Sequence, residues 1–269
     1  MEKFDQVAFS GGGIRCFWHG GFLSKVGNVD QLSPQLVTGV SGGVLSGASW
    51  IAQKEDELLD LMCEAFRIND SNLERDGVQV RTPHEAMYRA VVETLFDHGA
   101  VQAVSDGPEF CALLAVAPKA VPPKLAALIY GAIYKIDETF RSNPDLKAPS
   151  ALGLNTLKVD ARLAARDGRL VDLICAAATI PPVFSVPRWD GQRVIDAGMA
   201  SKIHLSDDPT LRSLALLTKR YENVPERPNL TFVSPSEEVA ADKIDFTDAT
   251  KVHATWELGE RDAERWLSG

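Results

Sequence analysis

A serine flanked by glycines is the strongest candidate for chemistry in this sequence. Gly39-Val40-Ser41-Gly42-Gly43 follows an apolar pair and precedes small and apolar residues that recur at helical spacing over 44–51. This pattern predicts a strand, a sharp turn and a helix, and a serine at such a turn projects its hydroxyl from the end of the sheet. Glycines are favoured there because the turn leaves little room for Cβ atoms. Ser41 is therefore the candidate nucleophile, and the positive end of the following helix would favour negative charge that develops beside it.

A second glycine-rich turn lies near the N-terminus. The buried strand predicted over Val7-Ala8-Phe9-Ser10 leads into Gly11-Gly12-Gly13-Ile14-Arg15 and then into a helical pattern over 16–26. Three consecutive glycines allow several backbone N–H groups to point into one space, which can hold a phosphate or an oxyanion. A dinucleotide-binding turn is disfavoured, because its fingerprint has glycine at the sixth position, where this sequence has Cys16. A tight turn without function stays an alternative.

An aspartate much later in the chain is the candidate partner for the serine. A helix of small residues is predicted over Leu170–Ala178, and two prolines that follow it fix a rigid turn. The chain then enters a predicted strand that ends at Asp196 and continues into Ala197-Gly198. If Asp196 is buried at this strand end, the charge of its carboxylate needs a partner or a role in the chemistry of the site, because burying an unpaired charge is costly.

The composition favours a single α/β domain. The chain has 269 residues, of which 45% are hydrophobic, and this is enough for a sizeable core. The net charge of −9 comes without any run of lysine or arginine, so a nucleic-acid partner and a basic membrane-binding patch are both disfavoured. We therefore expect one domain over residues 1–269.

Neither the cysteines nor the histidines have the spacing of a metal site. Cys16, Cys63, Cys111 and Cys175 stand singly among apolar residues and indicate reduced core thiols. The helical patterns that contain His19, His84 and His98 likewise lack ligand spacing. No metal or cofactor is predicted. The first residues do not form a signal peptide, so cytoplasmic residence is the expectation.

Further patterns predict the elements around these residues. Amphipathic helices are expected over 52–69 and 84–96, the second ended by Gly99, and a half-buried strand is expected over 154–163. A buried strand over 111–117 and an apolar helix over 125–134 follow from the most apolar region, whose prolines and lysines interrupt any membrane span. Two interpretations of the apolar helix stay open: a packed core helix, or a lid beside the active site.

Four segments in this order and spacing resemble the patatin-like phospholipases. They are Gly11-Gly12-Gly13-Ile14-Arg15, Gly39-Val40-Ser41-Gly42-Gly43, the segment from Ala177 to Phe184, and Asp196-Ala197-Gly198. The resemblance covers about residues 5–200. It implies a three-layer α/β/α sandwich with a central, mostly parallel sheet, and hydrolysis of lipid acyl esters during transient contact with a membrane surface.

The resemblance also implies a role for each matching residue. Ser41 corresponds to the nucleophile and Asp196 to the base of a serine–aspartate dyad that uses no histidine. The amides of Gly11, Gly12 and Gly13, joined by those of Ile14 and Gly42, correspond to the oxyanion hole, with Arg15 at the family's basic position. The sequence departs from the family at Ala197, where glycine is usual.

Two other functions remain as alternatives. An α/β-hydrolase triad would use Ser41, Asp196 and either His204 or His253, but that fold places its nucleophile after several strands, whereas one strand and one helix precede Ser41 here. A catalytically weak module that binds lipid or a partner protein is the other alternative, suggested by Ala197.

Overall fold

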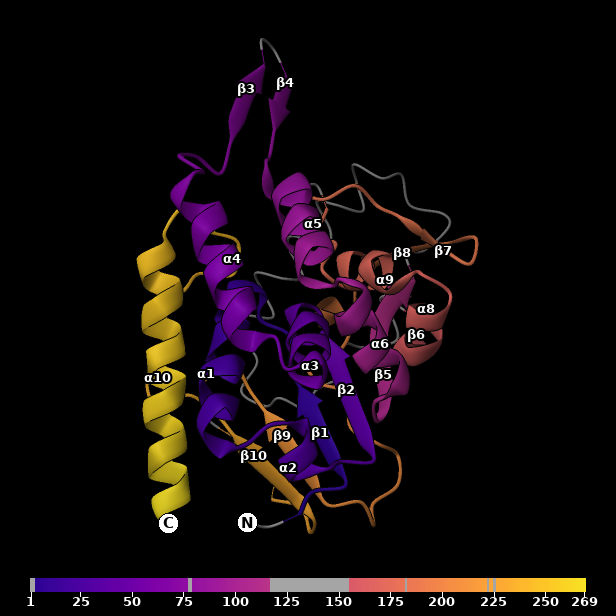
Figure 1. The fold of residues 1–269 in the computed structure, drawn as a ribbon, viewed down its shortest axis with the longest axis vertical. Coiled ribbons are helices and arrows are strands. Elements are labelled where there is room, and N and C mark those ends of the chain that lie inside the picture. The colour runs from indigo at the N-terminus through magenta and orange to yellow at the C-terminus, as the bar shows by residue number, and fades with distance from the viewer. Residues whose placement is uncertain (1–2, 77–78, 117–154, 182, 222, 225) are drawn as a thin grey trace.

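The computed structural model describes residues 3–76, 79–116, 155–181, 183–221, 223–224 and 226–269 (Figure 1). The strands are β1 Gln6–Phe9, β2 Leu36–Val40, β3 Glu74–Asp76, β4 Gln79–Arg81, β5 Glu109–Val116, β6 Asn155–Asp160, β7 Arg188–Trp189, β8 Gln192–Asp196, β9 Ser213–Leu216 and β10 Leu230–Val233. The helices are α1 Phe17–Val26, α2 Val29–Leu32, α3 Gly42–Ala52, α4 Glu55–Arg67, α5 His84–Leu95, α6 His98–Asp106, α8 Ala161–Arg166, α9 Leu170–Ala177 and α10 Ala249–Ser268, with 3₁₀ turns η1 Gly13–Cys16 and η3 Ala197–Met199.

A mostly parallel sheet forms the centre of the fold. Its order is β10-β9-β1-β2-β5-β8-β7, and β6 pairs with β5. The five strands from β10 to β5 run parallel to one another, while β6 and β8 both run antiparallel to β5. Helices flank this sheet (Figure 1). The predicted α/β sandwich with a central, mostly parallel sheet is therefore confirmed.

The register of β5 brings two distant strand ends together. One edge of β5 pairs with β6. On the opposite edge β2 pairs with the first part of β5, up to Val40 opposite Leu113, and β8 pairs with the last part, from Asp196 opposite Leu114. Strands β2 and β8 thus meet end to end along one edge of β5, and the residue after Val40 arrives beside Asp196.

The alternation of side chains in β1 divides the core between the two faces of the sheet. Val7 and Phe9 join the main apolar cluster, which includes residues from α1, α3, α4, α5, α9 and α10. Ala8 belongs to a smaller cluster on the other side, with Ile203 and Ala215. This is the period-two pattern of a strand that is buried on both faces.

Two boundaries predicted from the sequence are wrong. Gly99 does not end the helix that begins at His84, because α5 already ends at Leu95 and Gly99 lies in the first turn of a separate helix, α6. The Asp97 side chain accepts a hydrogen bond from the N–H of Ala100 at 2.8 Å and starts α6 as its N-cap. Asp97, two residues after the end of α5, therefore starts a new helix where the glycine was expected to end the old one.

The half-buried strand expected over 154–163 is also too long. Leu157 and Val159 point inward as predicted, but β6 ends at Asp160 and helix α8 follows at once. The Asp160 side chain accepts hydrogen bonds from the N–H groups of Arg162 and Leu163, which caps α8. The apolar helix expected over 125–134 lies outside the described residues.

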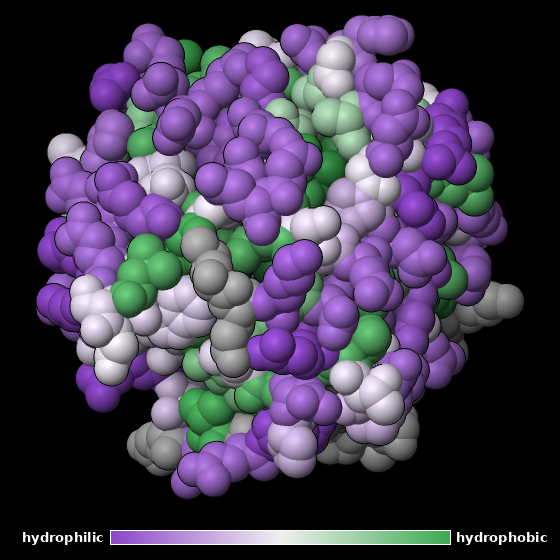
Figure 2. Space-filling model, turned by 60° about the horizontal axis from the view of Figure 1, so that its bottom comes forward, coloured by the Kyte–Doolittle hydropathy of each residue, from purple (hydrophilic) through white to green (hydrophobic). Residues whose placement is uncertain are grey.

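One end of the molecule is predominantly polar. Figure 2 shows this end, where hydrophilic residues predominate and apolar residues form small, separated patches. Within the described ranges, no helix has the length and apolar character needed to cross a membrane.

Candidate active site

Ser41 occupies a strained turn between β2 and α3. Its φ of 55° lies in the left-handed region, which is uncommon for a residue with a side chain. Gly43 makes the turn possible, because a Cβ there would lie only 2.6 Å from the carbonyl oxygens of Phe9 and Ser10. The backbone strain therefore accompanies a tight approach of the turn to the end of β1. Ser41 directly precedes α3 as its N-cap residue, which fits the predicted order of strand, turn and helix.

The structure brings Ser41 and Asp196 into direct contact. The Ser41 Oγ donates a hydrogen bond to Asp196 Oδ2 at 2.6 Å, and the N–H of Gly198 donates to Asp196 Oδ1 at 2.7 Å. Both side chains are buried. Burial raises the pKa of Asp196 to about 6, although the hydrogen bonds from Ser41 and Gly198 act in the opposite direction. This carboxylate is therefore a stronger base than an ordinary aspartate.

The unusual Ala197 is accommodated without moving the carboxylate. Its side chain is fully buried in an apolar cluster with Val40, Leu113 and Ile195. The turn that follows still delivers the N–H of Gly198 to Asp196. The methyl group thus fills space under the turn and does not block the contact between Ser41 and Asp196.

The predicted oxyanion loop lies against Ser41, but only some of its amides point to unoccupied space. A Cβ at Gly11 would lie 3.0 Å from the Ser41 Cβ, so the loop passes close to the hydroxyl. The N–H of Gly11 donates to Lys202 O at 2.8 Å, and the N–H of Ile14 donates to Lys243 O at 3.2 Å.

Three amides remain as candidate oxyanion donors. The Arg15 amide also donates within the loop, to Gly12 O at 3.3 Å. Among the described residues, the N–H groups of Gly12, Gly13 and Gly42 have no acceptor. Of the six residues predicted to form or flank the oxyanion hole, these three therefore fit the role of amide donor best.

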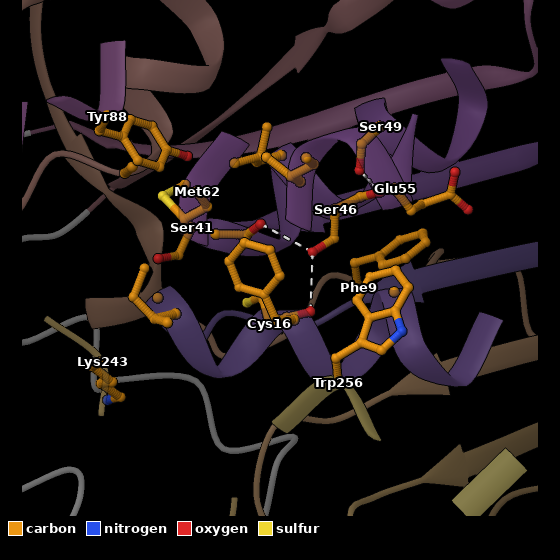
Figure 3. A pocket seen from close by; sticks show the side chains of 18 of the residues that line it. Phe9, Cys16, Ser41, Ser46, Ser49, Glu55, Met62, Tyr88, Lys243 and Trp256 are labelled. Atoms are coloured by element: carbon orange, nitrogen blue, oxygen red, sulfur yellow. Dashed lines mark hydrogen bonds between the residues drawn. The ribbon is translucent and has the colours of Figure 1, made fainter. Parts of the chain in front are cut away.

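An apolar channel runs from Ser41 along α3. The side of α3 that faces it carries Ser41, Gly42, Leu45, Ser46, Ser49 and Trp50, which corresponds to about 13 Å of helix. The opposite walls come from α1, α4, α5 and α10, from the loop after α9 and from the loop before α10; they include Phe17, Leu23, Leu58, Met62, Tyr88, Phe184, Phe246 and Trp256. In Figure 3, Ser41 lies at one end of this channel and Glu55 at the other.

Glu55 is the one acidic residue that lines the described part of the channel. It is the first residue of α4, and burial raises the pKa of its carboxyl to about 7. The far end of the channel therefore carries a carboxyl that is protonated in part at neutral pH.

A second cavity opens beside Ser41 and is lined in part by charged residues. Ser41, Asp196 and the three glycines of the loop line it, together with Thr218, Tyr221 and four cationic residues, namely Arg15, Lys202, Lys219 and Lys243. Burial and the nearby Arg15 guanidinium lower the pKa of Lys243 to about 7. The two cavities meet at the nucleophile, so the site has an apolar side and a cationic side.

Neither histidine of the triad alternative lines these cavities. His204 and His253 are absent from the lining of both. The His204 carbonyl instead accepts a hydrogen bond from Thr38 Oγ1 at 2.5 Å behind the sheet. The Ser41 hydroxyl contacts the Asp196 carboxylate directly, whereas a triad places an imidazole between the two groups.

Sequence patterns did not single out Tyr88 or Lys243. Tyr88 stands among ordinary core residues of α5, and Lys243 belongs to a loop without a motif. Their positions in the two cavities depend on tertiary packing, for which the sequence alone gives no signal. No group of three or more potential metal ligands occurs in the part of the chain that the structure describes.

Comparisons with known proteins agree with this architecture. The Patatin-like phospholipase family model matches residues 7–207. The crystal structure of VipD from Legionella pneumophila superposes with a TM-score of 0.54 at 8% sequence identity, over 99% of this chain and 67% of that one. At this identity the structural match shows the fold alone. A search of curated proteins gives no match.

Proposed function

The chain belongs to the patatin-like phospholipase family, and on this basis we propose that it is a lipid acyl hydrolase that cleaves carboxylic esters through a Ser41–Asp196 dyad. The observation that carries the proposal is the hydrogen bond of 2.6 Å from the Ser41 Oγ to Asp196 Oδ2. These residues lie 155 positions apart in the sequence, and the register of β5 joins them at one point.

In the first half of the reaction, Ser41 is acylated. The Ser41 Oγ attacks the ester carbonyl carbon, and its proton passes to Asp196 along the existing hydrogen bond. The carbonyl oxygen becomes an oxyanion, which the amides of Gly12, Gly13 and Gly42 stabilise; one such donor contributes about 3 kcal/mol. When the C–O bond breaks, Asp196 returns the proton to the leaving alcohol, and an acyl-serine remains.

In the second half, water releases the acyl group. Asp196 takes a proton from the water, the hydroxide adds to the acyl carbonyl, and the same amides hold the second oxyanion. Ser41 leaves with the proton from Asp196, and a free fatty acid departs. The proposed chemistry uses only groups of the protein and water.

The two cavities support a phospholipid substrate. The apolar channel that begins at Ser41 has the lining that an acyl chain requires. Arg15, Lys202 and Lys219 beside the nucleophile, joined by Lys243 in its protonated form, supply positive charge for a phosphate-bearing head group, although the chain as a whole carries a net charge of −9. We propose that the protein acts on such lipids in the cytoplasm during transient contact with a membrane surface.

Products released from a mixed lipid extract test this function. We expect the wild-type protein to release free fatty acids and lysophospholipids, which mass spectrometry identifies. Ser41→Ala should reduce the rate at least about 10³-fold, because only the oxyanion donors and substrate binding remain. Substitution of His204 and of His253 by Ala serves as the matched control and should leave the rate unchanged. A large loss in either histidine variant would favour the triad, and full activity in Ser41→Ala would contradict the proposal.

A further inference from the structure

The hydroxyl of Tyr88 is buried in the channel without a hydrogen-bond partner. Tyr88 is 5% exposed, and its Oη contacts no donor or acceptor in the described structure. Buried polar atoms are rarely left unpaired in native proteins, and each exception calls for an explanation. The other residues with such atoms are Ser10, His19, His84 and Arg162, none of which lines the channel.

The Tyr88 hydroxyl faces the part of the channel nearest the nucleophile. Figure 3 shows the phenol directed toward the interior of the channel, on the side where Met62 and Ser41 lie. Its ring makes a T-shaped contact with Phe184, with 6.1 Å between the ring centroids, so the ring has an apolar support. Burial, followed by the nearby Cys175, Cys16 and Asp196, keeps the pKa of Tyr88 well above its ordinary value. The phenol therefore remains protonated and can donate its proton.

We infer that Tyr88 is a specificity-determining residue that donates a hydrogen bond to an oxygen on the acyl chain, close to the ester carbonyl. The inference rests on the proposed acyl hydrolase function. An acyl chain without oxygen would fill this part of the channel and leave the Tyr88 hydroxyl desolvated and unpaired. A chain with a hydroxyl or keto oxygen at that position would pair with it. The preferred substrates are accordingly esters of oxygenated fatty acids.

The other oxygens of the substrate have different places in the site. The carbonyl oxygen faces the amides of Gly12, Gly13 and Gly42 under the proposed mechanism. The leaving alcohol and its head group fit the cationic cavity, which Tyr88 does not line. Tyr88 lines the apolar channel and also a cavity beside α9 that Ser41 does not line, so the substrate oxygen that it can reach belongs to the first carbons of the acyl chain.

Glu55 provides a positional contrast within the same channel. Its carboxyl lies at the opposite end from Ser41 in Figure 3, so it cannot serve an oxygen near the ester carbonyl. An oxygen near the methyl end of the chain would meet Glu55 and not Tyr88. The position of the oxygen along the chain therefore separates the two residues experimentally.

Three p-nitrophenyl esters of equal chain length test the inference. One acyl chain is unsubstituted, one carries a 3-hydroxyl group, and one carries a hydroxyl group near its methyl end. For the wild type we expect kcat/KM to be at least about tenfold higher for the 3-hydroxyacyl ester than for the unsubstituted one, because a site built to pair with a hydroxyl discriminates against its absence. Tyr88→Phe should remove this preference by slowing the 3-hydroxyacyl ester, with little change for the unsubstituted ester.

Stability and active-site labelling separate this role from a structural one. Tyr88→Phe removes a hydroxyl that has no partner, so the melting temperature should stay the same or rise. The matched control is Ser105→Ala in α6, where a buried hydroxyl donates to Asp106 Oδ1 at 3.3 Å; this variant should lose stability and keep the substrate preference. Labelling of Ser41 by a fluorophosphonate should proceed at the wild-type rate in Tyr88→Phe.

Several outcomes would overturn the inference. If the wild type has equal kcat/KM for the unsubstituted and the 3-hydroxyacyl ester, this comparison alone overturns the inference. An equal loss on both esters in Tyr88→Phe would assign a general role to the residue, and a preference for the distal hydroxyl would place the recognition at Glu55. In each case the proposed hydrolase function would stand. Absence of hydrolysis of any ester by the wild type would remove both proposals.

Discussion

The chemistry of the proposed site depends on one carboxylate with an unusual pKa. Asp196 is fully enclosed, and the hydrogen bonds from Ser41 and Gly198 offset only part of the effect of burial, so its pKa is about 6. A base with a pKa nearer to the working pH transfers protons more effectively than one near 4. In the proposed dyad, the environment of the aspartate thus compensates for the absence of a histidine.

The pH dependence of activity follows from this pKa. We predict that kcat/KM falls as the pH drops through about 6, because Asp196 becomes protonated and can no longer accept the Ser41 proton. A rate profile from pH 4.5 to 9 with a soluble ester checks this. An inflection near pH 4 would mean that the aspartate behaves as an exposed one, and an inflection near 7 that disappears in His204→Ala or His253→Ala would favour the triad.

The same shift makes Asp196 a source of instability. The folded protein binds the Asp196 proton more tightly than the unfolded chain does, since the pKa rises from 3.8 to about 6 on folding. The resulting penalty is absent below pH 3.8, grows between these values and is complete above about pH 6, where it reaches at most about 3 kcal/mol.

Asp196→Asn tests both consequences together. We expect kcat to fall by about 10²- to 10⁴-fold. The free energy of unfolding at pH 8 should not decrease, because the buried charge is gone even though one acceptor is lost. A variant that keeps near wild-type activity, or that unfolds at pH 8 while the wild type is stable, would contradict this account; urea titrations and steady-state kinetics give the two readouts.

At the residue scale, the sequence was informative where a motif constrains the backbone. Ser41 and Asp196 were predictable because each ends a strand at a glycine-containing turn. The choice among the loop amides was not, because it depends on where the Lys202 and Lys243 carbonyls lie. Tyr88 was not predictable either, since an aromatic residue on a helical apolar face is ordinary core.

At the element scale, the close packing of α1 against α10 supports the channel. These helices lie side by side (Figure 1), and glycines allow their backbones to approach. A Cβ at Gly21 would collide with the Trp256 backbone, and a Cβ at Gly259 would collide with the Trp18 carbonyl. Trp256 itself lines the channel, so the contact between the helices also sets the shape of its wall.

We predict that Gly21→Ala destabilises the protein by about 1–3 kcal/mol, because the added methyl must displace backbone and not a flexible side chain. Circular dichroism during thermal unfolding measures this. Gly99→Ala is the matched control: Gly99 is an exposed residue of α6, where an added Cβ would meet only Asp97 Oδ1 at 3.4 Å, and the substitution should raise stability slightly through helix propensity. Equal effects of the two substitutions would show that helix propensity, and not the α1–α10 contact, dominates.

Element boundaries were less predictable than element types. The helices α4, α5 and α9 and the strands β1, β2 and β5 were expected from apolar periodicity, and the structure contains them. The errors at Gly99 and after Asp160 share a cause, because in each case an aspartate side chain caps a new helix. The sequence pattern had predicted a helix end in the first case and a longer strand in the second.

At the scale of the whole molecule, the chain beyond the family match completes the site. The match ends at residue 207, yet Lys243, Phe246 and Trp256 line the channel. The Trp18 Nε1 donates a hydrogen bond to Asp262 Oδ2 at 2.9 Å, which joins α1 to α10 inside the core. No local sequence motif predicts these contacts, because the residues that make them interact with segments far away in the sequence.

We therefore propose that residues 1–269 form one cooperative domain, and we predict a single unfolding transition. The fluorescence of the five tryptophans, which include Trp18 and Trp256 at the contact of α1 and α10, should change at the same urea concentration as far-UV circular dichroism. Trp18→Phe should shift both curves together, to lower urea, because it leaves Asp262 with one donor fewer. Transitions that separate in either protein would indicate that the C-terminal helix unfolds independently.

The central claim, that the Ser41 hydroxyl is the nucleophile and is activated by Asp196, is tested most directly by labelling the folded protein with a fluorophosphonate and mapping the modified peptide by mass spectrometry. We predict one label per chain on the peptide that contains Ser41, no label in Ser41→Ala, and much slower labelling in Asp196→Asn. A label on a different residue, or a folded wild-type protein that does not react, would contradict the claim.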